Sequence, residues 1–155
     1  MEIERKFLVK QIPKDYKTYP RIVMTQAYLN VNPVVRIRKE NDDYVLTYKA
    51  GEGLSRQECN LPLDAQSFDH LLEKADGIML NKTRYQIPLS QTLTAELDLF
   101  FGDYQGLSYV EVEFASEEEA LAFVPPNWFG KEVTYDHKFS NSSLSQGKIP
   151  LSELQ

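Results

Sequence analysis

Charged side chains of one sign recur in this sequence as pairs, two positions apart. The pairs are Glu2/Glu4, Arg36/Arg38, Lys82/Arg84, Glu96/Asp98 and Glu111/Glu113. On a β-strand, residues two apart lie roughly 6.5 Å from each other on one face, where like charges repel unless opposite charge lies between them. Arginine and lysine bind phosphate, while Mg²⁺ and Mn²⁺ take carboxylates, phosphate oxygens and water. The pairs therefore indicate a site for a polyphosphate with divalent cations.

Alternation of polar and apolar residues predicts the strands that position these pairs. The predicted strands are 1–9, 22–30, 33–40, 43–50, 54–61, 78–87, 93–101 and 107–115. Most joins between them are short and carry turn residues, as at Asn32-Pro33 and Gly51-Glu52-Gly53, so neighbouring strands should be antiparallel. Eight antiparallel strands can close into a barrel whose interior holds one small ligand.

Sorting each strand by odd and even positions gathers the charges on one face. That face carries the bases Lys6, Arg36, Arg38, Lys49, Arg56, Lys82 and Arg84, and the acids Glu2, Glu4, Glu58, Glu96, Asp98, Glu111 and Glu113. If this face points inward, the barrel encloses a charged tunnel and its apolar outer faces need cover. So many charges would be intolerable in a dry interior. A multiply charged ligand that brings both signs would make the arrangement favourable.

Three segments are predicted to be helical, and the first two could provide that cover. A capping residue followed by an amphipathic pattern marks 64–76 and 116–124, and a third segment is expected from about 134 to 146. The fold class is mainly β (α+β), an eight-stranded antiparallel barrel forming a charged tunnel with a few helices outside. Residues 1–147 are expected to form one domain, followed by a loose C-terminal tail over 148–155.

The composition excludes several classes of protein. The chain has 155 residues, and 17 basic against 23 acidic residues give a net charge of −6, which argues against binding to nucleic acid or anionic membranes. Its one cysteine excludes a disulfide scaffold. No apolar run approaches the roughly 20 residues of a membrane span, and the first residues lack the basic region of a signal peptide. We expect a cytoplasmic protein with a small-molecule partner; the oligomeric state is open, a homodimer being one option.

The segment Glu2-Ile3-Glu4-Arg5-Lys6 resembles the N-terminal Glu-x-Glu-x-Lys signature of the CYTH superfamily, the triphosphate tunnel metalloenzymes. The motifs that follow in the family's order are Arg36-x-Arg38, Lys49, Arg56-x-Glu58, Lys82-x-Arg84, Glu96-x-Asp98, Glu111-x-Glu113 and Glu132-Val133-Thr134-x-Asp136. The resemblance covers residues 2 to about 144 and is strongest to short bacterial members that hydrolyse inorganic tripolyphosphate. Phe139 stands where relatives often carry tyrosine, a change that matters only if that hydroxyl bonds a ligand.

The resemblance implies a tunnel that binds triphosphate along its axis together with a divalent metal, Mg²⁺ or Mn²⁺. It assigns phosphate binding to Lys6, Arg36, Arg38, Lys49, Arg56, Lys82 and Arg84. It assigns metal binding to Glu2, Glu4, Glu111 and Glu113, with Glu96 and Asp98 as further ligands or water-orienting groups, and it gives Glu2, Glu4 and Lys6 catalytic roles. The implied reaction is metal-assisted phosphoryl transfer to water, which splits tripolyphosphate into pyrophosphate and phosphate.

Other interpretations stay open. Within the superfamily, an adenylate cyclase or a phosphatase of nucleoside or thiamine triphosphates would need a surface for the base or thiazolium at the tunnel mouth, and none is recognisable. A non-catalytic polyphosphate- or nucleotide-binding module would need the bases but not the acidic pairs. A barrel or sandwich with an apolar core would place the charges outside. Tyr28 is also open, because its hydroxyl could enter the tunnel or its ring could simply pack.

Overall fold

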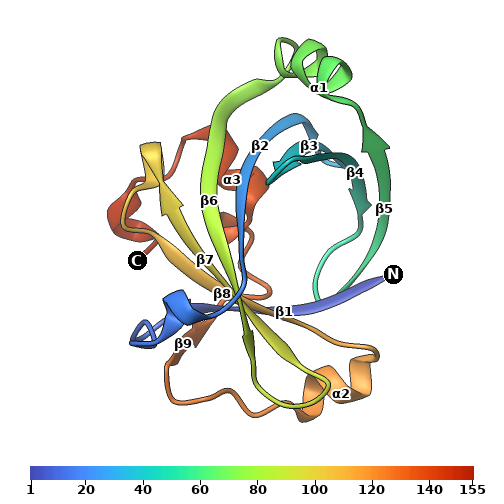
Figure 1. The fold of residues 1–155 in the computed structure, drawn as a ribbon. Helices are drawn as coiled ribbons and strands as arrows, with labels where there is room; N and C mark the ends of the chain where they lie inside the picture. Colours follow the sequence, from blue (N-terminus) through green and yellow to red (C-terminus); the bar gives the residue numbers. More distant parts are fainter.

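Eight antiparallel strands close into a barrel, seen end-on in Figure 1. The computed structural model describes residues 1–155. The barrel strands are β1 (Glu2–Val9), β2 (Arg21–Val31), β3 (Val34–Glu40), β4 (Asp43–Ala50), β5 (Ser55–Leu63), β6 (Asp76–Pro88), β7 (Thr94–Phe101) and β8 (Ser108–Glu113). Their order is β5-β4-β3-β2-β6-β7-β8-β1, and pairing of Glu2 with Arg56 and of Ile3 with Ser55 joins β1 to β5. The predicted eight-stranded barrel is confirmed.

A ninth strand and two helices lie outside the barrel, and a third helix lies across one of its ends. The strand β9 (Phe129–Glu132), which the sequence pattern did not predict, pairs with the end of β1 that β5 does not reach. The helices α1 (Ala65–Leu72), α2 (Glu117–Ala122) and α3 (Asn141–Gln146) fall within the predicted segments, and short 3-10 turns occur at η1 (Tyr16–Thr18), η2 (Gly102–Tyr104), η3 (His137–Phe139) and η4 (Leu151–Glu153). None of the helices has the length and apolar character needed to cross a membrane.

Helices cover the apolar outer faces of the strands, as the sequence requires. Phe68 of α1 packs against Ala27 and Ile37 of β2 and β3. On another side, Ala120 of α2 joins a cluster that includes Phe7 of β1. Both helices begin after the side-chain caps expected from the sequence. With the apolar faces buried outside, the inward positions are free to carry charge.

Arg5 points outward from β1 and ties three elements together. Its Nε and Nη2 donate to the two carboxylate oxygens of Glu132 on β9 at 2.8 and 2.7 Å. Its Nη1 donates to the carbonyls of Ala120 and Phe123 at the end of α2, at 2.8 and 3.0 Å. Thr134 donates to the same Glu132 carboxylate at 2.6 Å. The C-terminal motif that begins at Glu132 therefore holds β1, and with it the N-terminal acidic pair, in position.

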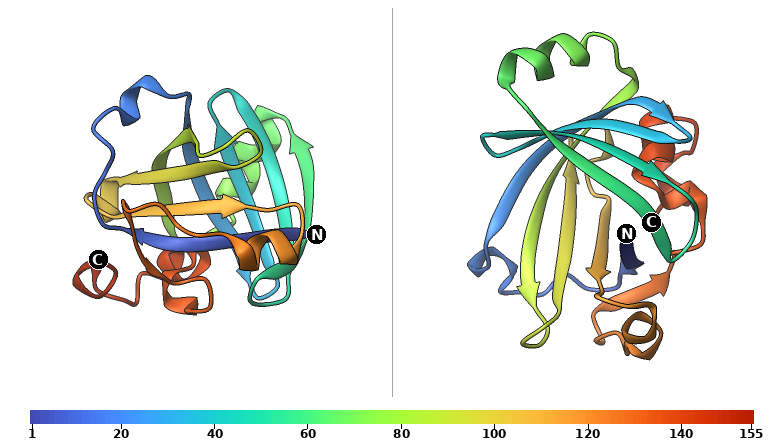
Figure 2. Two further views of the ribbon diagram at one scale, coloured as in Figure 1. Left: turned by 90° about the horizontal axis from the view of Figure 1, so that it is seen from below. Right: turned by 90° about the vertical axis from the view of Figure 1, so that its right-hand side faces the viewer.

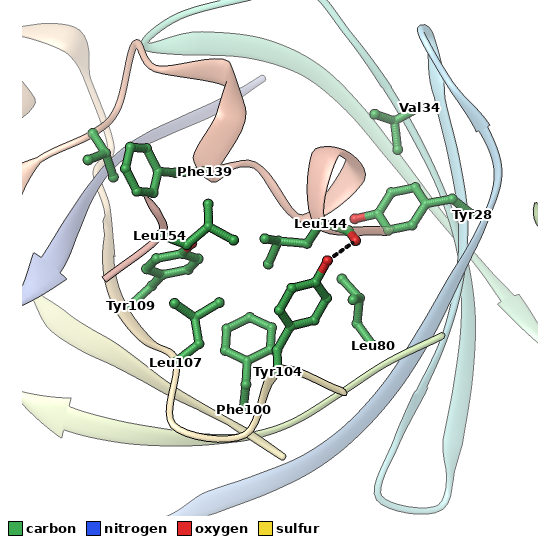
Figure 3. Close-up of a cluster of buried hydrophobic side chains, with 11 residues drawn as sticks. Tyr28, Val34, Leu80, Phe100, Tyr104, Leu107, Tyr109, Phe139, Leu144 and Leu154 are labelled. Atoms are coloured by element: carbon green, nitrogen blue, oxygen red, sulfur yellow. Dashed lines mark hydrogen bonds between the residues drawn. The ribbon is translucent and has the colours of Figure 1, made fainter. Parts of the chain in front are cut away.

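One end of the barrel interior is filled by apolar side chains, which we call the plug. The plug consists of Tyr28, Val34, Leu80, Phe100, Tyr104, Leu107, Tyr109, Val133, Phe139, Leu144 and Leu154. Figure 3 shows strand residues gathered around the C-terminal segment, with the Tyr104 hydroxyl donating to the carbonyl of Leu144 at 2.6 Å. In Figure 2 this segment, drawn in red, lies across one end of the barrel. The charged part of the interior is therefore confined to the remainder.

The prediction of a loose C-terminal tail is wrong. Residues Leu151–Glu153 form a 3-10 turn, and Leu154 is fully buried in the plug. The reason is a tertiary contact, because Leu154 packs against residues remote in sequence, and no local sequence pattern predicts that contact. Phe139 also packs in the plug, edge-to-face with Tyr109 at 6.1 Å between ring centroids. Its ring therefore has a packing role that needs no hydroxyl.

Gly77, at the start of β6, allows α3 to approach closely. Its φ is +72°, and a Cβ there would overlap the carbonyl oxygen of Ser145. We expect Gly77→Ala to lower the free energy of unfolding by about 3 kcal/mol, because it combines backbone strain with a steric clash. Gly102→Ala is the matched control for urea denaturation: its φ is +75° but the nearest atom lies at 3.5 Å, so about 1 kcal/mol should be lost. Equal losses would contradict the packing of α3 on β6.

Candidate functional site

The inner face beyond the plug surrounds a cavity of about 350 Å³ whose wall is divided by charge. An acidic wall comes from β1, β7 and β8 and consists of Glu2, Glu4, Glu96, Glu111 and Glu113. A basic wall comes from β3, β4 and β5 and consists of Arg36, Arg38, Lys49 and Arg56. Arg84 of β6 also lines the cavity, and Glu40 and Glu58 lie among the bases. The two walls meet where β1 pairs with β5.

Two arginines of the basic wall keep donors free. Neither Arg36 nor Arg56 forms a salt bridge. Arg36 is only 6% exposed; its Nη2 donates to the Thr47 hydroxyl at 3.2 Å, and its buried Nε has no partner. Arg56 donates Nε to the Gly51 carbonyl at 3.2 Å. A buried guanidinium without a counter-ion is unfavourable, so this wall favours binding of an anion. Phosphate suits it because its oxygens can accept two parallel N–H hydrogen bonds from one guanidinium.

Lys49 and two carboxyl groups form a cluster where the walls meet. Lys49 Nζ lies 3.0 and 3.1 Å from the two oxygens of Glu2 and 3.3 Å from Glu58 Oε2. Burial raises the pKa of Glu2 to about 7. Burial would also raise the pKa of Glu58, but the hydrogen bond with Glu2 and the Lys49 ammonium outweigh it and lower that pKa to about 2. Of the two carboxyl groups, Glu2 therefore takes up a proton more readily than Glu58.

Glu4 and Glu111 form a second carboxyl pair. Burial raises the pKa of Glu4 well above its ordinary value, and the nearby Glu111 and Glu2 carboxylates raise it further. Burial would raise the pKa of Glu111 as well, but Lys6 at 4.0 Å and Arg84 at 3.9 Å outweigh it and hold that pKa well below its usual range. The acidic wall thus has more carboxyl groups than the bases in contact with it, Lys6, Lys49 and Arg84, can neutralise.

The chemistry of the acidic wall fits a divalent cation. Carboxylate oxygens are the ligands that Mg²⁺ and Mn²⁺ prefer, and crowded carboxyl pairs release their protons when a cation binds. No three acidic side chains converge into a preformed metal cage. The absence of a cage agrees with the usual coordination of Mg²⁺, in which one or two protein carboxylates bind and phosphate oxygens and water occupy the other positions. The carboxylates available for this role are Glu2, Glu4, Glu111 and Glu113.

Three of the predicted site residues do not line this cavity, namely Lys6, Lys82 and Asp98. Lys82 and Asp98 are 0% and 1% exposed, and Lys82 Nζ donates to Asp98 Oδ2 at 2.6 Å. Asp98 also accepts from Nε and Nη2 of Arg84, at 2.8 and 2.9 Å. Glu96 accepts from Nη1 of the same arginine at 3.1 Å. Both oxygens of Asp98 are therefore engaged, and this carboxylate orients Arg84 toward the cavity.

Lys6 lies beside a second cavity of about 460 Å³ that shares Glu4, Arg56 and Ser142 with the first. Its Nζ donates to the Phe139 carbonyl at 2.6 Å and sits 4.4 Å from the centroid of the Tyr109 ring. Burial lowers the pKa of Lys6. The lysine of the N-terminal signature thus connects the acidic wall to the C-terminal segment.

Several residues around the cavity were not predicted as site residues. Both readings of Tyr28 hold, because its ring belongs to the plug while the residue lines the cavity and its hydroxyl accepts from Gln26 Nε2 at 3.2 Å. Asn60 lies on the charged face of β5 and could have been found by parity. Asn141 and Ser142 come from α3, and nothing in the strand pattern points to them.

Comparisons with known proteins agree with this geometry. The CYTH domain family matches residues 1–135. The inorganic triphosphatase of Nitrosomonas europaea is 41% identical over 147 residues, which cover 93% of this chain and 96% of that protein. The inorganic triphosphatase of Acetivibrio thermocellus is 32% identical over 148 residues, covering 92% of each.

Solved structures are similar as well. The crystal structure of the inorganic triphosphatase NE1496 is 37% identical and superposes with a TM-score of 0.71, covering 97% of both chains. HpAC1 from Hippeastrum, described as having a dominant triphosphatase activity, is 20% identical with a TM-score of 0.60, covering 78% of this chain and 83% of that one. The second likeness concerns the fold alone.

Proposed function

The chain belongs to the CYTH domain family, and on that premise we propose that it hydrolyses inorganic tripolyphosphate to pyrophosphate and phosphate with the help of Mg²⁺ or Mn²⁺. The observation that carries the proposal is the facing of an acidic and a basic wall across one cavity. A polyphosphate with a divalent cation offers negative charge to the basic wall and positive charge to the acidic wall.

In this proposal the basic wall and its neighbours bind the phosphates. Arg36 and Arg56, which form no salt bridge, would provide the strongest contacts, with Arg38 and Lys49 beside them. Arg84 is held rigidly by Asp98 and would stabilise negative charge that develops on the leaving pyrophosphate. Lys82 would act through the same carboxylate and not by direct contact. Lys6 would contact the bound polyphosphate only after its hydrogen bond to the Phe139 carbonyl breaks.

One or two of the acidic-wall residues Glu2, Glu4, Glu111 and Glu113 would hold the cation directly, and the others would hold it through water. A divalent cation supplies neutralisation of phosphate charge and lowers the pKa of a nearby water. Glu96 lies at the edge of the wall and would orient the attacking water. Burial raises the pKa of Glu2 and Glu4, and a carboxylate with a raised pKa is the better acceptor for a proton from that water.

The acidic wall also separates this proposal from the alternatives. A non-catalytic phosphate-binding module would gain nothing from crowded carboxyl groups, whose burial is unfavourable. A cyclase or a nucleotide-specific phosphatase would need a surface for the base. We place the enzyme in the cytoplasm, where its single exposed cysteine stays reduced.

Release of orthophosphate from tripolyphosphate, ATP and thiamine triphosphate, each with Mg²⁺, Mn²⁺ or EDTA, tests the proposal. We expect metal-dependent turnover that is strongest on tripolyphosphate and absent in EDTA. Stronger turnover of ATP or thiamine triphosphate would move the specificity to another triphosphate. Absence of turnover on all three would contradict the hydrolase itself, and conversion of ATP to cyclic AMP would then identify a cyclase.

A further inference from the structure

The chain beyond residue 135 lies outside the part that matches the CYTH domain family, yet it reaches the charged cavity. Asn141 and Ser142 of α3 line this cavity together with Tyr28 and Val34 of the plug. Ser142 also lines the second cavity, so these two polar residues lie at the boundary between the charged cavity, the second cavity and the plug. We call Asn141 and Ser142 the floor of the cavity.

Contacts on both sides hold the floor in place. Before it, the Phe139 carbonyl accepts from Lys6 Nζ at 2.6 Å. After it, the Leu144 carbonyl accepts from the Tyr104 hydroxyl at 2.6 Å, and Leu144 is buried in the plug. Within it, the Ser142 carbonyl accepts from the Ser145 hydroxyl at 2.6 Å. The floor is therefore a fixed surface and not a mobile lid.

Two residues that line this cavity each have a buried polar atom with no partner in the protein. The two atoms are Asn141 Oδ1 and Arg36 Nε. A buried polar atom without a hydrogen bond costs about 1–3 kcal/mol, so Arg36 Nε–H favours an acceptor, and the partner that the Asn141 amide favours depends on which of its two ends faces the cavity. A phosphate group accepts from Arg36 Nε–H, and also from the Asn141 amide when its N–H₂ end turns toward the cavity.

We propose that Asn141, supported by Ser142, binds a phosphate group of the substrate at the floor of the cavity. The inference rests on the proposed triphosphate hydrolysis and deepens it. Arg36 lines the same cavity as Asn141 and Ser142, which places a guanidinium and an amide around the same ligand space.

Two substitutions at Asn141 and one control test the proposal. Asn141→Ala removes the amide, and Asn141→Asp keeps its shape but places a carboxylate against the phosphate. Ser143→Ala is the matched control, because Ser143 belongs to the same helix and does not line the cavity. Steady-state kinetics with tripolyphosphate and Mg²⁺ give KM and kcat, and calorimetric titration of tripolyphosphate in EDTA gives a Kd without turnover.

We expect Asn141→Ala to raise KM and Kd about tenfold with little change in kcat, as loss of one hydrogen bond to a charged group predicts. Asn141→Asp should raise both at least about a hundredfold, while Ser143→Ala leaves them unchanged. If both Asn141 variants match the control, or if kcat falls with Kd unchanged, the floor does not bind the phosphate. Absence of turnover in the unmodified protein would instead overturn the proposed function.

Discussion

Replacing Glu2 and Glu4 together by glutamine is expected to reduce metal-dependent hydrolysis of tripolyphosphate at least about 10³-fold. Both side chains line the acidic wall, and a divalent cation held there supplies several kcal/mol of charge stabilisation, with each 1.4 kcal/mol worth a factor of ten in rate. Neutral amides of the same shape cannot replace carboxylate ligands. Phosphate release measures the activity, and electron paramagnetic resonance of bound Mn²⁺ measures the cation directly.

The same double variant should keep its fold. Burial raises the pKa of both side chains, so the folded protein already disfavours their charge, and Lys49 retains Glu58 at 3.3 Å. Circular dichroism and thermal unfolding should therefore match the unmodified protein. Glu118→Gln with Glu119→Gln removes the same two charges from the outer helix α2 and should leave hydrolysis unchanged. Full metal-dependent activity in the Glu2/Glu4 variant would refute the role of the acidic wall.

Asp98→Asn is expected to cause the largest loss of stability, about 3–5 kcal/mol in urea denaturation. Its carboxylate accepts three hydrogen bonds from Lys82 and Arg84 in a fully buried position. Breaking a buried ion pair by removing one partner leaves the other charge uncompensated, which is the costly case. Arg84 would also lose its fixed orientation, so the KM for tripolyphosphate should rise.

A second variant separates this cost from mere loss of packing. Asp98→Asn combined with Lys82→Met removes one buried charge of each sign and should recover part of the stability that Asp98→Asn loses. If Asp98 were instead a metal ligand, Asp98→Asn would weaken Mn²⁺ binding as strongly as the Glu2/Glu4 variant does. We expect Mn²⁺ affinity to be largely retained.

The barrel strands could be predicted because their two faces differ so sharply. In β6, for example, Lys82 and Arg84 alternate with Thr83 and Tyr85. Such alternation predicts a strand, because only a strand places alternate side chains on opposite faces. The strand β9 could not be predicted, because its four residues carry no alternation of their own. They become a strand by pairing with the end of β1, a contact that joins distant parts of the chain.

For the site, parity identifies the face of a side chain but not its depth in the barrel. Phe100 continues the inward face of Asp98, and Tyr109 continues that of Glu111. Where charge gives way to the plug depends on the C-terminal segment, which is remote in sequence. For the same reason the buried position of Asp98 and the floor residue Asn141 could not be read from the strands.

The ring of strands is joined by a short seam between β1 and β5. Across it Glu2 pairs with Arg56 and Ile3 with Ser55, and the Glu4 N–H donates to the Leu54 carbonyl at 3.2 Å. The seam thus lies between a member of the acidic wall and a member of the basic wall. A cation held by Glu2 and a phosphate held by Arg56 would cross-link it from within, so ring closure and ligand binding are linked equilibria. Hydrolysis of the bound chain therefore also removes a cross-link from the barrel.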